Sequence, residues 1–274
     1  SANYKSQWRS VPVNYFTLSG NYDQKIYSQK NDKIFFGAGA NFNFDQAGDG
    51  KFGLLNLNFL GSFTYMFNQH IFITPGLGIG FGQRSINSAG LNFGDQWRGD
   101  YFDKNPTSGE KINLDRMSFL YPETSLGLNL RLQNSSRTKL DVGGGFCHLN
   151  SPKIHFYDGS DSKLPVTMSL YGLGSIYLAQ PFDLIVNAAY RRSDTYNETL
   201  VGAALKVYLS TKRGKEFAVV GGVNLRTKDA WVPTVELHVN QWRAGISYDI
   251  NNSPFEIATE KKGGLEVSLQ YIIT

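Results

Sequence analysis

Apolar and polar side chains alternate one by one along most of this 274-residue chain. The last stretch shows the pattern plainly, with an apolar set Leu265, Val267, Leu269, Tyr271 and Ile273 and an intervening set Glu266, Ser268, Gln270 and Ile272. A period of two places successive side chains on opposite faces of a β-strand. About fourteen such segments follow one another with almost no helical periodicity, so the sequence predicts an all-β protein.

The connections between these segments alternate in length as well. Long connections occupy odd positions in the order, at 45–51, 86–116, 150–162 and 251–262. The even connections are mostly tight, and 24–32 is the exception. Bacterial membrane barrels have an even strand number, short periplasmic turns and long outer loops, whereas a soluble sandwich has no reason to sort its loops.

The pattern therefore predicts a transmembrane antiparallel β-barrel of about 14 strands, of the outer-membrane type. We expect residues 1–274 to form a single barrel domain, with long outer loops near 86–116, 150–162 and 251–262. Short periplasmic turns and a C-terminal strand that ends the chain place both termini in the periplasm.

The polar phase of the strands carries charges of both signs. Its members are Lys5, Arg9, Asp23, Arg131, Asp141, Asp183, Lys206, Glu236, Arg243, Asp249 and Glu266. In a barrel this phase lines the lumen, where ions pair or meet water. In a soluble sandwich it would be a solvated outer face.

Composition excludes several classes of protein. Mean hydropathy is -0.30, and no segment approaches the roughly 20 apolar residues of a membrane-spanning helix. Aromatic residues reach 14%, which suits the two interfacial girdles of a barrel. A net charge of +4 is too small to indicate nucleic-acid binding, and one cysteine, Cys147, allows no intrachain disulfide. The chain starts at Ser1 without an initiating Met, which favours a processed form.

No residue set predicts catalysis, and no cofactor or metal is expected. The histidines His70, His148, His155 and His238 are scattered without ligand spacing. His148 and His155 could join a metal only with Asp158 or Asp161, and a barrel lipase would need a partner set for His148. A solvated histidine at a strand end is the simpler interpretation.

The outer loops carry the composition of a protein-binding surface. Residues 86–116 contain Trp97, Arg98, Tyr101 and Phe102, and the other long loops add Phe156, Tyr157 and Phe255. Aromatic residues with Arg are typical of binding hot spots, so we expect these residues to bind a partner. The alternative is that the rings pack the loops onto each other and close the barrel mouth.

The even connections form a basic periplasmic rim. Lys25, Lys30 and Arg137 lie in such turns, and Lys212, Arg213 and Lys215 share one. They could meet anionic lipid headgroups or an acidic periplasmic partner, or simply be solvated.

Several stretches resemble a known family. The opening carries Gln7, Trp8, Arg9, Pro12, Tyr22 and Asp23, the long loop carries GDQWRGDYFD, and the end carries WVPTVELHVNQWRAGISYDI and GGLEVSLQYII. In this order they resemble the PorP/SprF family of outer-membrane proteins linked to the type IX secretion system. An NPAYAG-like segment that usually precedes the first strand of the family is absent from this sequence.

The resemblance implies a non-enzymatic outer-membrane barrel of the secretion and gliding machinery. Such a barrel is expected to dock or anchor a secreted surface protein, through the C-terminal domain of an adhesin, at the cell surface. Its other expected partners are the type IX translocon, periplasmic ring components and outer-membrane lipid. Alternatives are a periplasm-facing structural base for the secretion or motility ring, and a diffusion porin with an open lumen.

Overall fold

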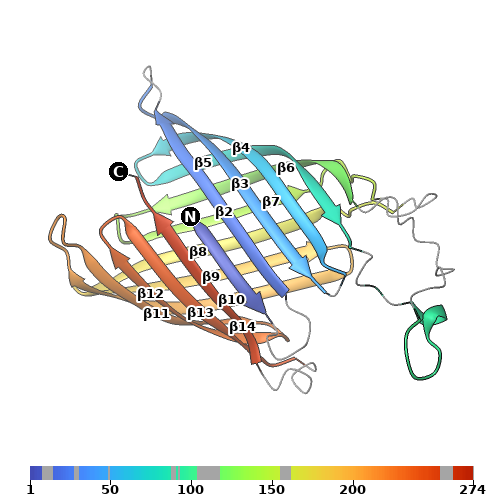
Figure 1. Cartoon of the computed structure of the whole chain (residues 1–274). Coiled ribbons are helices and arrows are strands. Elements are labelled where there is room, and N and C mark those ends of the chain that lie inside the picture. Colours follow the sequence, from blue (N-terminus) through green and yellow to red (C-terminus); the bar gives the residue numbers. More distant parts are fainter. Residues whose placement is uncertain are drawn as a thin grey trace.

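A computed structural model shows a closed antiparallel barrel of fourteen strands (Figure 1). It describes residues 1–7, 15–27, 31–48, 50–87, 91, 93–103, 118–154, 162–253 and 262–273. The strands are β1 (Ala2–Gln7), β2 (Tyr15–Tyr27), β3 (Ile34–Ala47), β4 (Phe52–Asn68), β5 (Ile71–Ser85), β6 (Ser118–Gln133), β7 (Lys139–Cys147), β8 (Thr167–Ala179), β9 (Phe182–Ser193), β10 (Tyr196–Ser210), β11 (Phe217–Arg226), β12 (Ala230–Val239), β13 (Trp242–Asn251) and β14 (Lys262–Tyr271).

Each strand pairs with its neighbours in the sequence, and β1 closes the ring by pairing with β14. In β1, Lys5 lies opposite Thr17 of β2 on one side and opposite Glu266 of β14 on the other. Closure leaves no edge strand in the sheet, as a lipid environment requires, although β2 continues beyond Gly20, its last residue paired with β1. The predicted fold, a fourteen-strand antiparallel barrel, is confirmed.

The barrel is apolar outside and polar inside. Outward rows of paired residues include Phe42, Leu57 and Phe81, while Leu77 and Ile79 are each 62% exposed. The most buried polar side chains face the lumen instead, with Asp183 only 1% and Asp249 only 4% exposed. A water-soluble protein has the opposite arrangement, so the outer surface is the one that suits lipid. Among the described residues, no helix is both long and apolar enough to pass through a bilayer.

The two ends of the barrel differ, and we name them by their connections. The short-turn end carries both termini and the tight β4–β5, β8–β9 and β12–β13 turns (Figure 1). The long-loop end carries the connections β5–β6, β7–β8 and β13–β14, together with three tight ones, β3–β4, β9–β10 and β11–β12. The long connection predicted at 45–51 is wrong, because β3 continues to Ala47 and only residues 48–51 precede β4. Sorting of loop lengths by parity holds for the other three long connections.

Strand bounds differ from the sequence-based ones at the N-terminal hairpins. The strand expected up to Arg9 ends at Gln7, and residues 8–14 lie outside the described part of the chain. β2 and β3 run further than expected, to Tyr27 and Ala47. Pairing continues there because Phe16 lies opposite Gln46, and the Thr17 hydroxyl donates to the Asp45 carboxylate at 2.7 Å.

Candidate functional site

The long-loop end displays a small hairpin within the β5–β6 connection. The 3-10 helix η2 (Gly94–Gln96) leads into an isolated bridge between Trp97 and Phe102. The Asp103 N–H donates to the Gln96 carbonyl and the Arg98 N–H to the Tyr101 carbonyl, both at 2.9 Å. We call residues 96–103 the aromatic hairpin.

Local sequence explains why this segment turns back on itself. Gly99 adopts a φ of 104°, a conformation that L side chains rarely adopt. The rings of Trp97 and Phe102 then meet across the hairpin with centroids 4.8 Å apart. Arg98 and Asp103 come within 3.9 Å, but their exposure makes this ion pair weak.

The aromatic hairpin presents its rings to the surroundings. Trp97, Tyr101 and Phe102 are 47%, 58% and 44% exposed, and in Figure 1 the hairpin lies clear of the barrel wall. The structure therefore brings together four of the predicted partner-binding residues, because Arg98 lies in the same turn. The other three, Phe156, Tyr157 and Phe255, lie outside the described residues.

The predicted basic rim occupies the β10–β11 turn at the short-turn end. Lys212, Arg213 and Lys215 are all exposed, and the Lys215 N–H closes the turn on the Lys212 carbonyl at 2.9 Å. The neighbouring turn supports it, because the Asn240 side-chain oxygen accepts the Glu216 N–H at 2.9 Å. No ion pair within the described part of the chain holds these three side chains.

The Arg137 side chain is a second basic element at this end, and its partner could not be predicted from the sequence. It leaves the β6–β7 turn and reaches Asp183 at 2.7 Å, while its guanidinium also donates to the Gln180 and Ala179 carbonyls. Its hydrogen bond with Asp183 raises the pKa of Arg137 above the usual value. We call this pair the Arg137 latch, because it ties the β6–β7 turn to the β8–β9 turn.

Two tyrosine rings also contact the Arg137 guanidinium. The rings of Tyr177 and Tyr208 lie 4.5 and 4.4 Å from the guanidinium carbon, and the Tyr208 hydroxyl donates to Asp183 at 2.7 Å. Register shifts occur at Tyr177/Ala179 and at Tyr208/Ser210, next to both tyrosines. Such irregularities re-aim side chains, which explains how two rings converge on one guanidinium.

Inside the barrel at the long-loop end, charges of opposite sign are paired. Lys5 contacts Asp249 at 2.8 Å and Glu266 at 3.7 Å, while Arg226 contacts Asp229 at 2.8 Å and Asp249 at 3.2 Å. These contacts link β1, β11, β13 and β14, so they also bridge the seam where the barrel closes.

His148 belongs to another polar contact at the long-loop end. Its Nε2 lies 3.1 Å from Glu123, whose carboxylate also accepts from the Asn56 amide at 2.6 Å. Glu123 is 8% exposed, so these contacts satisfy a buried carboxyl group. No group of three or more possible metal ligands occurs among the described residues, and His155, Asp158 and Asp161 lie outside them.

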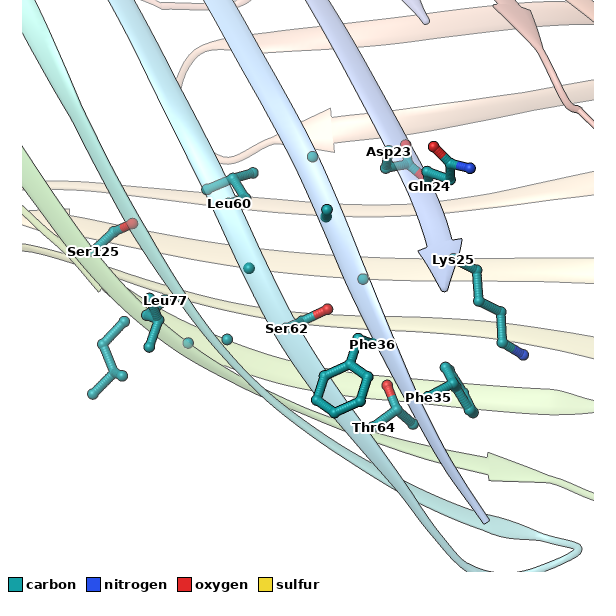
Figure 2. Close-up of a pocket in the computed structure, with 18 of the residues that line it drawn as sticks. Asp23, Gln24, Lys25, Phe35, Phe36, Leu60, Ser62, Thr64, Leu77 and Ser125 are labelled. Carbon is teal, nitrogen blue, oxygen red and sulfur yellow. The ribbon is translucent and has the colours of Figure 1, made fainter. Parts of the chain in front are cut away.

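A cavity of about 530 Å³ lies against the wall formed by β2–β8 (Figure 2). One row of paired residues crosses this wall on the lumenal face and consists of glycine and serine: Gly37, Ser62, Gly76, Gly127, Gly145 and Ser169. Small side chains in a continuous row leave the space empty. Lys25 lies over the Phe35 ring at 3.6 Å at one edge of the cavity.

Solved structures with the same architecture are outer-membrane barrels. A TodX deltaS2S3 mutant monoaromatic hydrocarbon channel aligns with 98% of this chain, with a TM-score of 0.52 and 10% identity. The alignment covers 88% of the channel's own chain. A TodX deltaS2 mutant gives a TM-score of 0.50 and 9% identity over 99% of this chain and 89% of that one. At such identities the likeness shows the fold alone.

Other matched structures are longer than this chain. It covers 65% of a Pseudomonas aeruginosa FadL homologue, with 94% of this chain aligned, 11% identity and a TM-score of 0.44. It covers 42% of the siderophore receptor PirA from Acinetobacter baumannii, so it spans less than two thirds of these barrels. No curated protein matches the sequence.

The family comparison covers almost the whole chain. Residues 1–271 match the family described as "Type IX secretion system membrane protein PorP/SprF". The match includes every strand and both ends of the barrel, and it agrees with the fold. The chain therefore belongs to the PorP/SprF family of type IX secretion membrane proteins and has the fold of an outer-membrane barrel.

Proposed function

We propose that this barrel anchors a secreted surface protein at its long-loop end, which faces the cell exterior. Both termini and the short turns then face the periplasm, as in bacterial outer-membrane barrels generally. Membership in a type IX secretion family implies partners within that machinery. The specific partner we propose is a secreted protein with a C-terminal secretion domain, and the role is non-enzymatic.

The aromatic hairpin is the observation that supports this proposal. Its three large rings are about half exposed although they belong to a loop and not to the lipid-facing strands. Rings that closed the barrel mouth would pack against other loops and lose that exposure. A preformed hairpin also reduces the ordering cost of binding, because Trp97 and Phe102 already contact each other.

Alanine substitution of Trp97 and Tyr101 tests the proposal. Each truncated hot-spot ring typically costs about 2 kcal/mol or more of binding free energy, so the retained protein should appear in the culture medium. Secreted proteins in the medium and on washed cells would be compared by mass spectrometry, with the barrel itself quantified in the membrane fraction. The matched control is Trp231→Ala, since Trp231 is equally exposed at 46% but lies on the outward face of β12.

A second candidate function follows from the charge at the short-turn end. Lys212, Arg213 and Lys215 form an exposed basic turn, which suits an acidic component of the periplasmic ring. Replacing Lys212, Arg213 and Lys215 by Gln tests this candidate. If that change detaches the secreted protein while the Trp97 and Tyr101 variant retains it, the barrel is a base for the machinery. A porin would instead show stepwise conductance in planar bilayers.

A further inference from the structure

Positive charge also gathers inside the lumen at the short-turn end. Lys139 of β7, Lys206 of β10 and Arg243 of β13 lie on the lumenal phase, since their opposite residues are Ser175, Asp183 and His238. We call these three residues the lumenal basic cluster. Among the described residues, none of the three makes an ion pair, although Arg243 and Lys139 are close enough to repel Lys206.

Three acidic side chains lie near the cluster and offset only part of its charge. Asp183 attracts Lys206, but its oxygens accept hydrogen bonds from Arg137 and Tyr208. Glu236 lies 3.0 Å from His238 Nε2 and is attracted to Arg243 and Lys206, while Glu216 lines the same space. The three cations outnumber these two carboxyl groups. The cluster therefore keeps a net positive charge in a partly enclosed space, where electrostatic interactions are stronger than in bulk water.

A cavity of about 290 Å³ lies between these cations and the basic turn. Its lining includes Lys206, Tyr208, His238 and Arg243 from the lumenal wall, and Ser210, Thr211 and Glu216 from the turn. Ala218, which also lines the cavity, is 4% exposed. Positive charge thus continues from Arg243, through the cavity, to Lys212, Arg213 and Lys215 at the rim.

We propose that this mouth of the lumen binds an acidic peptide segment, whose carboxylates pair with Lys206 and Arg243. The charge is distributed over a lumenal cavity and an adjoining turn, so it matches several carboxylates in sequence better than one small anion. Membrane lipid is a poorer fit because the two cations face the lumen and not the outward surface. The inference does not depend on what binds at the aromatic hairpin, which lies at the other end of the barrel.

Binding of hexaglutamate carrying an uncharged fluorophore tests the proposal. The purified full-length barrel in a nonionic detergent should bind this peptide, measured by fluorescence anisotropy, and added NaCl should weaken binding. The double variant Lys206→Gln/Arg243→Gln should bind about tenfold or more weakly, because two charge-assisted hydrogen bonds are lost. Lys206→Arg/Arg243→Lys, which keeps both charges, should retain most of the affinity.

The matched control removes two cations from the other end. Lys51→Gln/Lys228→Gln has the same net charge as the lumenal variant and should bind hexaglutamate like the unsubstituted barrel. Equal weakening of both variants would overturn the proposal, since binding would then follow net charge. So would full binding by the lumenal variant with loss only in Lys212→Gln/Arg213→Gln/Lys215→Gln, which would place the site on the rim.

A measurement on the unsubstituted barrel covers the case in which the lumenal variant does not fold. Hexaglutamate should slow acetylation of Lys206 by an amine-reactive reagent, read by mass spectrometry, and leave Lys228 unaffected. An unchanged rate at Lys206 contradicts the proposal. Protection by inorganic phosphate but not by hexaglutamate also contradicts it, because the site would then take a small anion.

Discussion

The two ends of the barrel use an arginine–aspartate pair in opposite ways. At the long-loop end, Arg98 and Asp103 meet at 3.9 Å on an exposed hairpin. At the short-turn end, Arg137 and Asp183 meet at 2.7 Å, with two tyrosine rings against the guanidinium and Asp183 almost fully buried. The first pair lies on the exposed aromatic hairpin and stabilises little, whereas the second holds two turns of the barrel together.

The charged side chains inside the lumen show the reverse difference between the two ends. At the long-loop end, Lys5 and Arg226 are matched by Asp249, Asp229 and Glu266. At the short-turn end, Lys206 and Arg243 make no ion pair among the described residues, although Glu236 attracts both. The charged residues that bridge the β1–β14 seam are thus paired with opposite charges, whereas the cations without an ion pair lie at the short-turn opening of the lumen. This difference separates residues that stabilise the fold from residues that are available to a ligand.

The largest effect is expected in cysteine labelling of the two ends, where one end should react on intact cells and the other should not. In a Cys147→Ser background, Asp100→Cys in the aromatic hairpin should react with a membrane-impermeant maleimide on intact cells. Arg213→Cys in the basic turn should react only after the outer membrane is opened. The reverse pattern would place the short turns outside and would remove the basis of the proposed anchoring.

Loss of the Arg137 latch should give the largest change in stability. Arg137→Ala leaves the buried Asp183 carboxylate without its cation, which typically costs about 3–5 kcal/mol. The matched change Arg98→Ala should cost less than about 1 kcal/mol, because that pair is exposed. Urea unfolding of barrels in lipid vesicles measures both values. Asp183→Asn added to Arg137→Ala should recover part of the loss, and no recovery would mean that the uncompensated charge is not the cause.

Adjacent residues of β13 test whether charge belongs only to the lumen. Ile246 is 57% exposed on the outward face near the middle of the strand, so Ile246→Arg should cost about 2–4 kcal/mol. Ser247→Arg enters the lumen opposite Glu266 and should cost less than about 1 kcal/mol. The same vesicle assay measures both variants, and similar costs would contradict the assignment of the two faces.

Sequence alone predicts the fold of this chain well, because its signals are local. Period-two alternation defines each strand, and the length of the long connections identifies the ends. The aromatic hairpin also has a local signal, since Gly99 and Asp100 stand between aromatic positions, a dipeptide typical of hairpin turns. The sequence analysis used only the composition of this loop and did not predict its shape.

The Arg137 latch could not be predicted in the same way. Arg137 and Asp183 are 46 positions apart, and nothing near either residue indicates that they meet. Their contact depends on the barrel register and on the two irregularities beside Tyr177 and Tyr208. Unpaired cations such as Lys206 and Arg243 pose the same problem, because the polar phase alone shows which charges face the lumen but not which of them are neutralised.

The smallest change in barrel stability is expected from Gly99→Ala, and this small size separates the hairpin from the barrel. A φ of 104° lies outside the conformations that alanine adopts readily, so this change should distort the hairpin turn. The barrel itself should keep its stability within about 0.5 kcal/mol, since the hairpin lies clear of the strands. Retention of the secreted protein should fall all the same, because Trp97 and Phe102 would no longer be held together. A barrel destabilised by more than about 1 kcal/mol would show that the hairpin packs into the mouth, and the long-loop end would then be a closed structural element like the short-turn latch.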